Sequence, residues 1–167
     1  MGQRASVQNE IKFENVEVPA ANILGGEGYG FLIAMRTFDR TRTGVASAAV
    51  GNAQAAYDYS REWAKKRIQF GHPVTNLQGV SFMLADMATE VDEARLLVWE
   101  TAWKLDQGKD ATPEATIMKQ HVDRMVMQVA DRALQILGGY GYIREYPVEL
   151  WLRNARGFAA FDGLAIV

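Results

Sequence analysis

Residues 80–105, VSFMLADMATEVDEARLLVWETAWKL, decide the predicted fold, because mostly apolar side chains recur there at alternating steps of four and three residues. This spacing places them along one side of an α-helix. The stripe consists of Val80, Leu84, Met87, Val91, Ala94, Val98, Thr101 and Leu105. A long helix with a single apolar stripe buries it against other helices, so the segment predicts a helical bundle.

The flanking sequence repeats this pattern. A first helix is predicted from Gly30 to about Arg67, about 55 Å long at 1.5 Å per residue. Its stripe runs Phe31, Met35, Phe38, Arg42, Val45, Ala49, Asn52, Ala56, Tyr59, Trp63. A third helix carries Met118, Val122, Met125, Val129, Ala133 and Ile136, and a shorter fourth is predicted from Pro147 to about Arg156. Short turns between these helices predict an all-α fold, an antiparallel up-and-down four-helix bundle.

The ends of the helices also carry sequence signals. Thr75 or Asn76 is expected to cap the second helix, and Thr112 the third, with Pro113 in its first turn. Before the bundle, residues 10–18 (EIKFENVEV) partly alternate apolar and polar side chains, which predicts one β-strand with a bulge. A lone strand needs a sheet, so it is interpreted as the remnant of an N-terminal β region or as a strand that pairs with another copy.

The composition limits the function classes. The 167 residues suit one domain, and 49% hydrophobic with 23% charged residues predicts a packed core. A net charge of −2 does not favour a nucleic-acid partner. Without cysteine, and with only His72 and His121, no metal site is expected. No apolar run reaches about 18 residues, so no membrane span is expected, and the sequence also lacks a signal peptide; a cytoplasmic or mitochondrial-matrix protein is the default.

Two basic positions are candidates for ligand binding. Arg42 occupies a position in the apolar stripe beside Asp39, which makes it either half of a helical ion pair or a ligand contact. Arg67 begins the run RIQFG (67–71), where it either caps the end of the helix with Gly71 or binds a phosphate beside Phe70.

Two glycine-containing runs leave similar alternatives. The run QILGGYG (135–141) has more glycines than a helix stop requires, and indicates either a tight turn or backbone close to a ligand. It follows a helix rather than a strand, so it is not the dinucleotide-binding fingerprint. Asp162-Gly163 reads as an ordinary turn pair or as a catalytic carboxylate. Met118, Met125 and Met127 are interpreted as core residues.

Taken together, these runs resemble the C-terminal part of an acyl-CoA dehydrogenase, and the resemblance covers nearly the whole chain. Six motifs in order and at family-like spacing make it specific, although each is weak alone. The matching runs are 1–6 (MGQRAS), 28–31 (GYGF), 38–42 (FDRTR), 67–71 (RIQFG), Gln78 with 82–85 (FMLA), and 135–153.

The resemblance implies a domain organisation. Enzymes of this family have an N-terminal helical domain, a middle β domain and a C-terminal four-helix bundle. Residues 1–24 are then the end of the β domain, a strand and linker, and 25–167 are the bundle. The resemblance also implies that this chain alone is incomplete as an enzyme.

The implied reaction is FAD-dependent α,β-dehydrogenation of an acyl-CoA thioester to a 2-enoyl-CoA, as in fatty acid β-oxidation. A carboxylate removes the α-proton, and the electrons then pass to an electron-transfer flavoprotein. The resemblance also implies a homodimer or homotetramer, with cofactor sites built across subunits.

The site residues carry over position by position. Asp162 matches the place of the catalytic base. Phe38, Asp39, Arg42 and Gly163 match acyl-CoA contacts. The FAD contacts match Arg67, Ile68, Gln69, Phe70, Leu77, Gln78, Gln135, Ile136, Leu137, Gly138 and Gly139.

The sequence departs from the family at the base. Many members carry Glu-Gly-Thr where this chain has Asp162-Gly163-Leu164. Aspartate keeps the carboxylate but shortens its reach by about 1 Å, and Leu164 lacks a hydroxyl. The alternative function is therefore a non-catalytic helical oligomerisation or partner subunit that retains part of an FAD site. Such a subunit would complement the other part of a divided enzyme.

Overall fold

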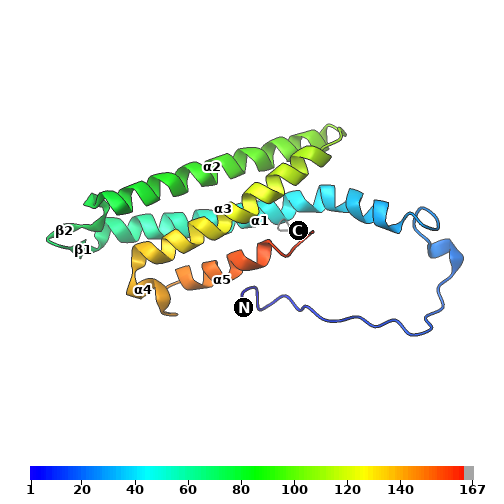
Figure 1. Ribbon diagram of the computed structural model, residues 1–167, viewed down its shortest axis with the longest axis horizontal. Helices are drawn as coiled ribbons and strands as arrows, with labels where there is room; N and C mark the ends of the chain where they lie inside the picture. The colour runs from blue at the N-terminus through cyan, green and yellow to red at the C-terminus, as the bar shows by residue number, and fades with distance from the viewer. Residues whose placement is uncertain (164–167) are drawn as a thin grey trace.

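The structure, a computed structural model, describes residues 1–163. Its main helices alternate in direction along the chain, and Figure 1 shows them lying side by side. This confirms the predicted up-and-down bundle. The elements are η1 (Ala20–Asn22), α1 (Gly30–Lys66), β1 (Ile68–Gln69), β2 (His72–Pro73), η2 (Val74–Asn76), α2 (Gln78–Asp106), α3 (Thr112–Leu137), α4 (Gly139–Tyr142) and α5 (Val148–Phe158).

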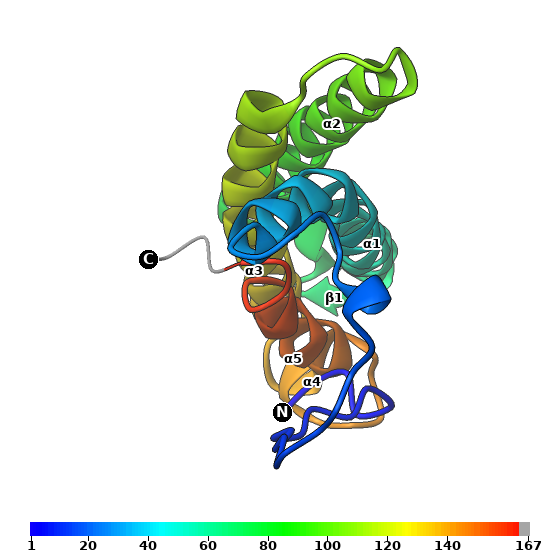
Figure 2. The same cartoon turned by 90° about the vertical axis from the view of Figure 1, so that its right-hand side faces the viewer.

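The core lies where α1 and α3 pack between α2 and α5, an arrangement seen end-on in Figure 2. The predicted stripe of α3 is wholly buried, and that of α2 is buried from Leu84 to Thr101, with Val80 and Leu105 half-buried. Because α1 presents mainly alanine to this core, its backbone can approach the larger Met and Val side chains of α3 closely. The buried alanines of α1 are Ala46, Ala49, Ala53, Ala56 and Ala64.

The first turns of α1 do not take part in the core, contrary to the predicted stripe. Phe31 is 76% exposed and Met35 half-buried, and burial begins at Ala46. At 37 residues α1 is about 55 Å long, against about 43 Å for α2 with 29 residues. Its N-terminal turns therefore project past the other helices (Figure 1).

Two predicted helix caps are wrong by one or two residues. Helix α2 follows Leu77, which makes no side-chain cap, while Thr75 and Asn76 belong to η2. Helix α3 begins at Thr112 itself, and the carboxylate of Asp110 accepts the Thr112 backbone N–H at 3.0 Å. That hydrogen bond, with a second from the Thr112 hydroxyl, lowers the pKa of Asp110. Pro113 lies in the first turn of α3 as predicted.

A tight hairpin joins α1 to α2. Ile68 pairs with Pro73 and Gln69 with His72, and the two turn residues, Phe70 and Gly71, both have positive φ (55° and 83°). This is the geometry of a two-residue hairpin turn, which favours glycine. Gly71 is therefore a turn residue and not, as one alternative had it, the residue that ends α1.

Residues 10–18 form no strand in the part of the chain that the structure describes. Ile11 and Phe13 are 74% and 76% exposed. A strand needs a neighbour for its backbone N–H and C=O groups, and no described segment lies against this one. The predicted strand is therefore absent here for want of a partner.

The first residues of the chain nevertheless return to the bundle. The backbone N–H of Gln3 donates to Asn154 Oδ1 at 2.7 Å, and Arg153 Nη1 donates to the carbonyl of Met1 at 3.1 Å. Gly2 fits because a Cβ there would lie 2.1 Å from the Arg153 carbonyl oxygen. The N-terminal segment thus contacts α5. No helix within residues 1–163 is long and apolar enough to cross a membrane.

Candidate functional site

The first candidate site joins α1 to the turn that follows α5. The Nε of Arg42 donates to the main-chain carbonyl of Asp162 at 3.0 Å, across 120 residues of sequence. The Nη1 of Arg42 lies 3.6 Å from Asp39 Oδ1, and these two side chains are only 18% and 16% exposed. Arg42 thus forms the helical ion pair with Asp39 and also reaches the predicted catalytic turn, whereas its contact with a ligand stays a prediction.

The turn itself has an unusual backbone. Asp162 has φ 54° and Gly163 φ 93°, and Asp162 is a non-glycine residue in the left-handed region. The Oδ2 of Asp162 is buried and has no hydrogen-bond partner within residues 1–163. A Cβ at Gly163 would lie 3.1 Å from Arg42 Nη2. Arg42 therefore packs closely against this turn. The Oδ2 atom of Asp162 in the turn receives no hydrogen bond from any described residue. Leu164 lies outside the described residues.

Asp39 and Phe38 complete this site. The hydroxyl of Thr112, at the start of α3, donates to Asp39 Oδ2 at 2.8 Å. The guanidinium carbon of Arg42 lies 5.8 Å from the centroid of the Phe38 ring. Sequence reasoning did not select Thr112 as a site residue, since its hydroxyl read as a helix cap. The carboxylate of Asp39 is thus already held by two neighbours.

The second candidate site lies at the other end of α1, under the hairpin. The guanidinium of Arg67 lies over the ring of Tyr140, 5.0 Å from its centroid. It does not serve there as the helix-capping group that one alternative proposed; instead it faces the turn after α3. The Trp63 ring contacts the Tyr140 ring at a tilt of 52°, with 5.2 Å between centroids, so the guanidinium of Arg67 lies over a pair of packed aromatic rings.

A cavity of about 560 Å³ opens at this place. It brings together most of the predicted FAD contacts, from three different elements. Those that line it are Arg67, Gln69, Gln135, Ile136, Leu137, Gly138 and Gly139. It is also lined by Trp63, Val74, Tyr140 and Ile143, which sequence reasoning did not select because aromatic and aliphatic residues read as core.

The remaining predicted contacts lie close by. Ile68 and Phe70 are exposed on the hairpin, Leu77 directly precedes α2, and Gln78 is its first residue. None of these four is among the described residues that line the cavity. Within the cavity wall, Ile136 and Leu137 are buried residues of the core and offer a ligand little surface.

The cavity fits the adenosine-pyrophosphate end of a dinucleotide. Arg67 supplies a fixed positive charge, and Trp63 and Tyr140 supply aromatic surface. Gly138, at φ 59°, and Gly139 leave open space where other residues carry a Cβ, with no atom within 4 Å of either position. Backbone N–H groups at this turn can therefore come close to a ligand.

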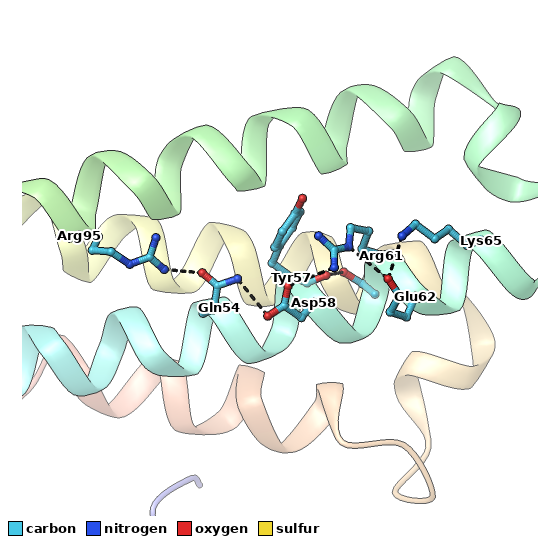
Figure 3. Close-up of polar contacts among 8 residues, drawn as sticks. Gln54, Tyr57, Asp58, Arg61, Glu62, Lys65 and Arg95 are labelled. Atoms are coloured by element: carbon cyan, nitrogen blue, oxygen red, sulfur yellow. Dashed lines mark hydrogen bonds and ion pairs between the residues drawn. The ribbon is translucent and has the colours of Figure 1, made fainter.

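One further polar cluster lies outside both sites, between α1 and α2 (Figure 3). Arg95 of α2 donates to Gln54 Oε1 on α1, and Gln54 Nε2 donates to Asp58 Oδ2 at 3.0 Å. Further along α1, Arg61 Nε lies 3.3 Å from Glu62. The ion pairs here are partly exposed, and such pairs contribute about 0–1 kcal/mol each. We therefore interpret this cluster as a structural link between two helices.

Comparisons with known proteins place the chain in a family. The family profile described as "Acyl-CoA dehydrogenase, C-terminal domain" matches residues 28–165. A curated relative, "Acyl-CoA dehydrogenase, short-chain specific" of Megasphaera elsdenii, is 45% identical over 98% of this chain and 43% of its own length. Another, "Caffeyl-CoA reductase-Etf complex subunit CarC" of Acetobacterium woodii, is 42% identical over 100% of this chain and 44% of its own length.

Among solved structures, butyryl-CoA dehydrogenase from Megasphaera elsdenii superposes with a TM-score of 0.88 at 45% identity, covering 92% of this chain and 40% of that one. The chain thus spans less than half the length of the curated relatives it matches. The fold, the order of the motifs and these matches agree, and the chain belongs to the acyl-CoA dehydrogenase family, whose C-terminal domain it contains.

Proposed function

We propose that this domain forms part of a flavoenzyme that dehydrogenates an acyl-CoA thioester between its α and β carbons, giving a 2-enoyl-CoA. By complete enzyme we mean the assembly that contains this domain together with the family's N-terminal helical and β domains. The observation that carries the proposal is the buried Oδ2 atom of half-buried Asp162, which has no partner within residues 1–163, on a turn held by Arg42.

Asp162 is proposed as the base that removes the α-proton. A general base must come within about 2.6–3.2 Å of the proton donor, and burial excludes water that would compete for it. The chemistry that FAD supplies when bound is acceptance of a hydride from the β-carbon. Arg42 fixes the main chain of Asp162, so the position of the carboxylate depends on one rotatable side chain rather than on a loose turn.

The cavity beside Arg67 is the proposed site for the adenosine-pyrophosphate end of FAD. Its charge, aromatic surface and open glycine turn support this assignment. Arg67 would pair with a phosphate, while Gln69 and Gln135 offer amide groups for further hydrogen bonds.

The two sites on this chain cannot share one FAD. Arg42 lies on α1 and Arg67 follows its last residue, so the two are 25 residues and about 37 Å apart along the helix, a distance that we infer one FAD does not span. The flavin ring near Asp162 and the adenosine near Arg67 therefore belong to different FAD molecules. This separation supports a homodimer or homotetramer, in which each chain completes the cofactor site of its neighbour.

Substrate and electron acceptor follow from the family. Phe38, Asp39 and Arg42 are proposed to face the acyl-CoA, although Asp39 already binds Thr112 and Arg42. An electron-transfer flavoprotein is the proposed acceptor, supported by the Etf complex named for the Acetobacterium woodii relative.

The adenosine site can be tested on the 167-residue chain, because its lining comes from one chain. We expect saturable FAD binding in a fluorescence titration, and an Arg67→Met variant with a Kd raised about tenfold or more, since a charge-assisted phosphate contact is lost. Lys65→Met is the matched control, because Lys65 is a nearby exposed cation paired with Glu62. The absence of saturable binding by the wild-type chain, or an equal loss in both variants, would contradict the site.

A further inference from the structure

Helix α3 carries a buried ion pair that the proposed reaction does not use. Lys119 and Asp123 lie one turn apart, and their side chains are each only 4% exposed. The Nζ of Lys119 lies 2.5 Å from Asp123 Oδ2 and also donates to the main-chain carbonyl of Phe158 at 3.0 Å. Phe158 is the last residue of α5, so the lysine binds the C-terminal end of that helix.

The Phe158 carbonyl is where the turn to Asp162 begins. The same oxygen accepts the backbone N–H of Phe161 at 3.2 Å. At the other end of the turn, Arg42 of α1 holds the carbonyl of Asp162. Two cations on two different helices thus bind two carbonyls four residues apart, one at the start of the turn and the other that of the proposed base itself.

This arrangement is costly to fold. Removing a lysine and an aspartate from water costs several kcal/mol per ion, and a well-packed apolar pair is often as stable or more so. Burial raises the pKa of Asp123 against the opposing effect of Lys119, and Asp123 Oδ1 has no partner within residues 1–163. The stability of the fold alone therefore does not explain why this ion pair is buried. The lysine, however, donates a hydrogen bond to the Phe158 carbonyl, which no apolar side chain could do.

We propose that Lys119 is a positioning residue, which Asp123 holds in place and which fixes the end of α5 so that the Asp162 turn has one conformation. This inference rests on the proposed role of Asp162 as base. It adds a second anchor, from α3, to the one that Arg42 provides from α1.

The test separates positioning from stability with a double variant of the 167-residue chain. Lys119→Met alone leaves Asp123 buried without its partner and is expected to destabilise the fold. Lys119→Met with Asp123→Leu replaces the pair by apolar groups and should recover thermal stability. Lys104→Met is the control, because Lys104 makes an equally short ion pair, with Glu114, away from the turn.

Hydrogen exchange then measures how firmly the turn is held in one conformation. We expect backbone amides of residues 159–163 to exchange about tenfold faster in the double variant than in wild type, while the rest of α5 and the Lys104→Met control stay unchanged. Equal protection of residues 159–163 in the double variant and the control would overturn the proposal.

In the complete enzyme loaded with FAD, the same double variant should reduce its flavin about 10- to 100-fold more slowly at saturating acyl-CoA, with FAD content unchanged. If the double variant recovers both its thermal stability and the wild-type rate of flavin reduction, the ion pair has only a structural role and the inference is overturned. Failure of the proposed function is recognised separately: a wild-type flavin that acyl-CoA does not reduce would refute the dehydrogenation, and an Asp162→Asn variant that still reduces its flavin would refute the role of Asp162 as base.

Discussion

Arg42 can be separated experimentally from the substrate contacts around it. Replacing Arg42 by Met removes the hydrogen bond to the Asp162 carbonyl while keeping much of the side-chain volume. We expect the limiting rate of flavin reduction at saturating acyl-CoA to fall about 100-fold, since an error of about 1 Å in the base has that effect. FAD binding should persist, because the Arg67 site lies at the other end of α1.

The neighbouring Arg40→Met variant is the control, since Arg40 is exposed and makes no contact with the turn among the described interactions. Stopped-flow reduction measures both variants. If Arg42→Met changes only the acyl-CoA concentration needed for half-maximal rate, Arg42 binds substrate and does not position the base.

Single residues also mark where sequence patterns stop being informative. Lys119 and Asp123 form an i, i+4 pair, which is typical of a solvated helix face, and only the packing of α5 over them reveals that they are buried. The contact between Arg42 and Asp162 spans 120 residues, beyond the reach of any local pattern. The family resemblance selected both residues, but neither it nor the local pattern predicted their contact.

At the scale of elements, the glycine run after α3 combines two different requirements. A Cβ at Gly141 would lie 2.4 Å from the carbonyl oxygen of Leu134, whereas one at Gly139 meets no atom within 4 Å. We therefore expect Gly141→Ala to lower the stability of the chain by about 1–3 kcal/mol, because backbone must move to admit the methyl group. Gly139→Ala should leave stability nearly unchanged and weaken FAD binding instead.

Thermal unfolding followed by circular dichroism, with an FAD titration of each variant, checks this difference. Equal melting temperatures for wild type and Gly141→Ala would mean that the α3–α4 turn relaxes to admit the methyl group, which would contradict the steric requirement for glycine at this position.

The elements that sequence predicted well are those whose partners lie in the same chain. The stripes of α2 and α3 match their buried faces, because helix period and burial report the same geometry. The first turns of α1 and residues 10–18 have equally apolar patterns, yet remain exposed in residues 1–163. Their patterns predict a buried surface but cannot tell which segment covers it.

At the scale of the whole molecule, the length of α1 places the sites around Arg42 and Arg67 about 37 Å apart. The Asp162 turn lies toward one end, and the cavity under the hairpin lies at the other. This separation follows from the predicted length of the first helix, whereas the contact of the Asp162 turn with Arg42 could not be predicted, because it depends on how α5 packs against α1. Under the proposed function the two sites belong to two different FAD molecules, so an assembly of chains is part of the proposed mechanism.

The central claim is that Asp162 removes the α-proton in a flavin-dependent dehydrogenation. The most direct measurement is anaerobic addition of butyryl-CoA, and of a longer saturated acyl-CoA, to the complete FAD-loaded enzyme and to its Asp162→Asn variant. We predict that the wild-type flavin absorbance bleaches, whereas the variant binds FAD equally well and its flavin stays oxidised, because the amide cannot accept the proton. Bleaching of the variant at a rate near that of wild type would contradict the account and place the base elsewhere.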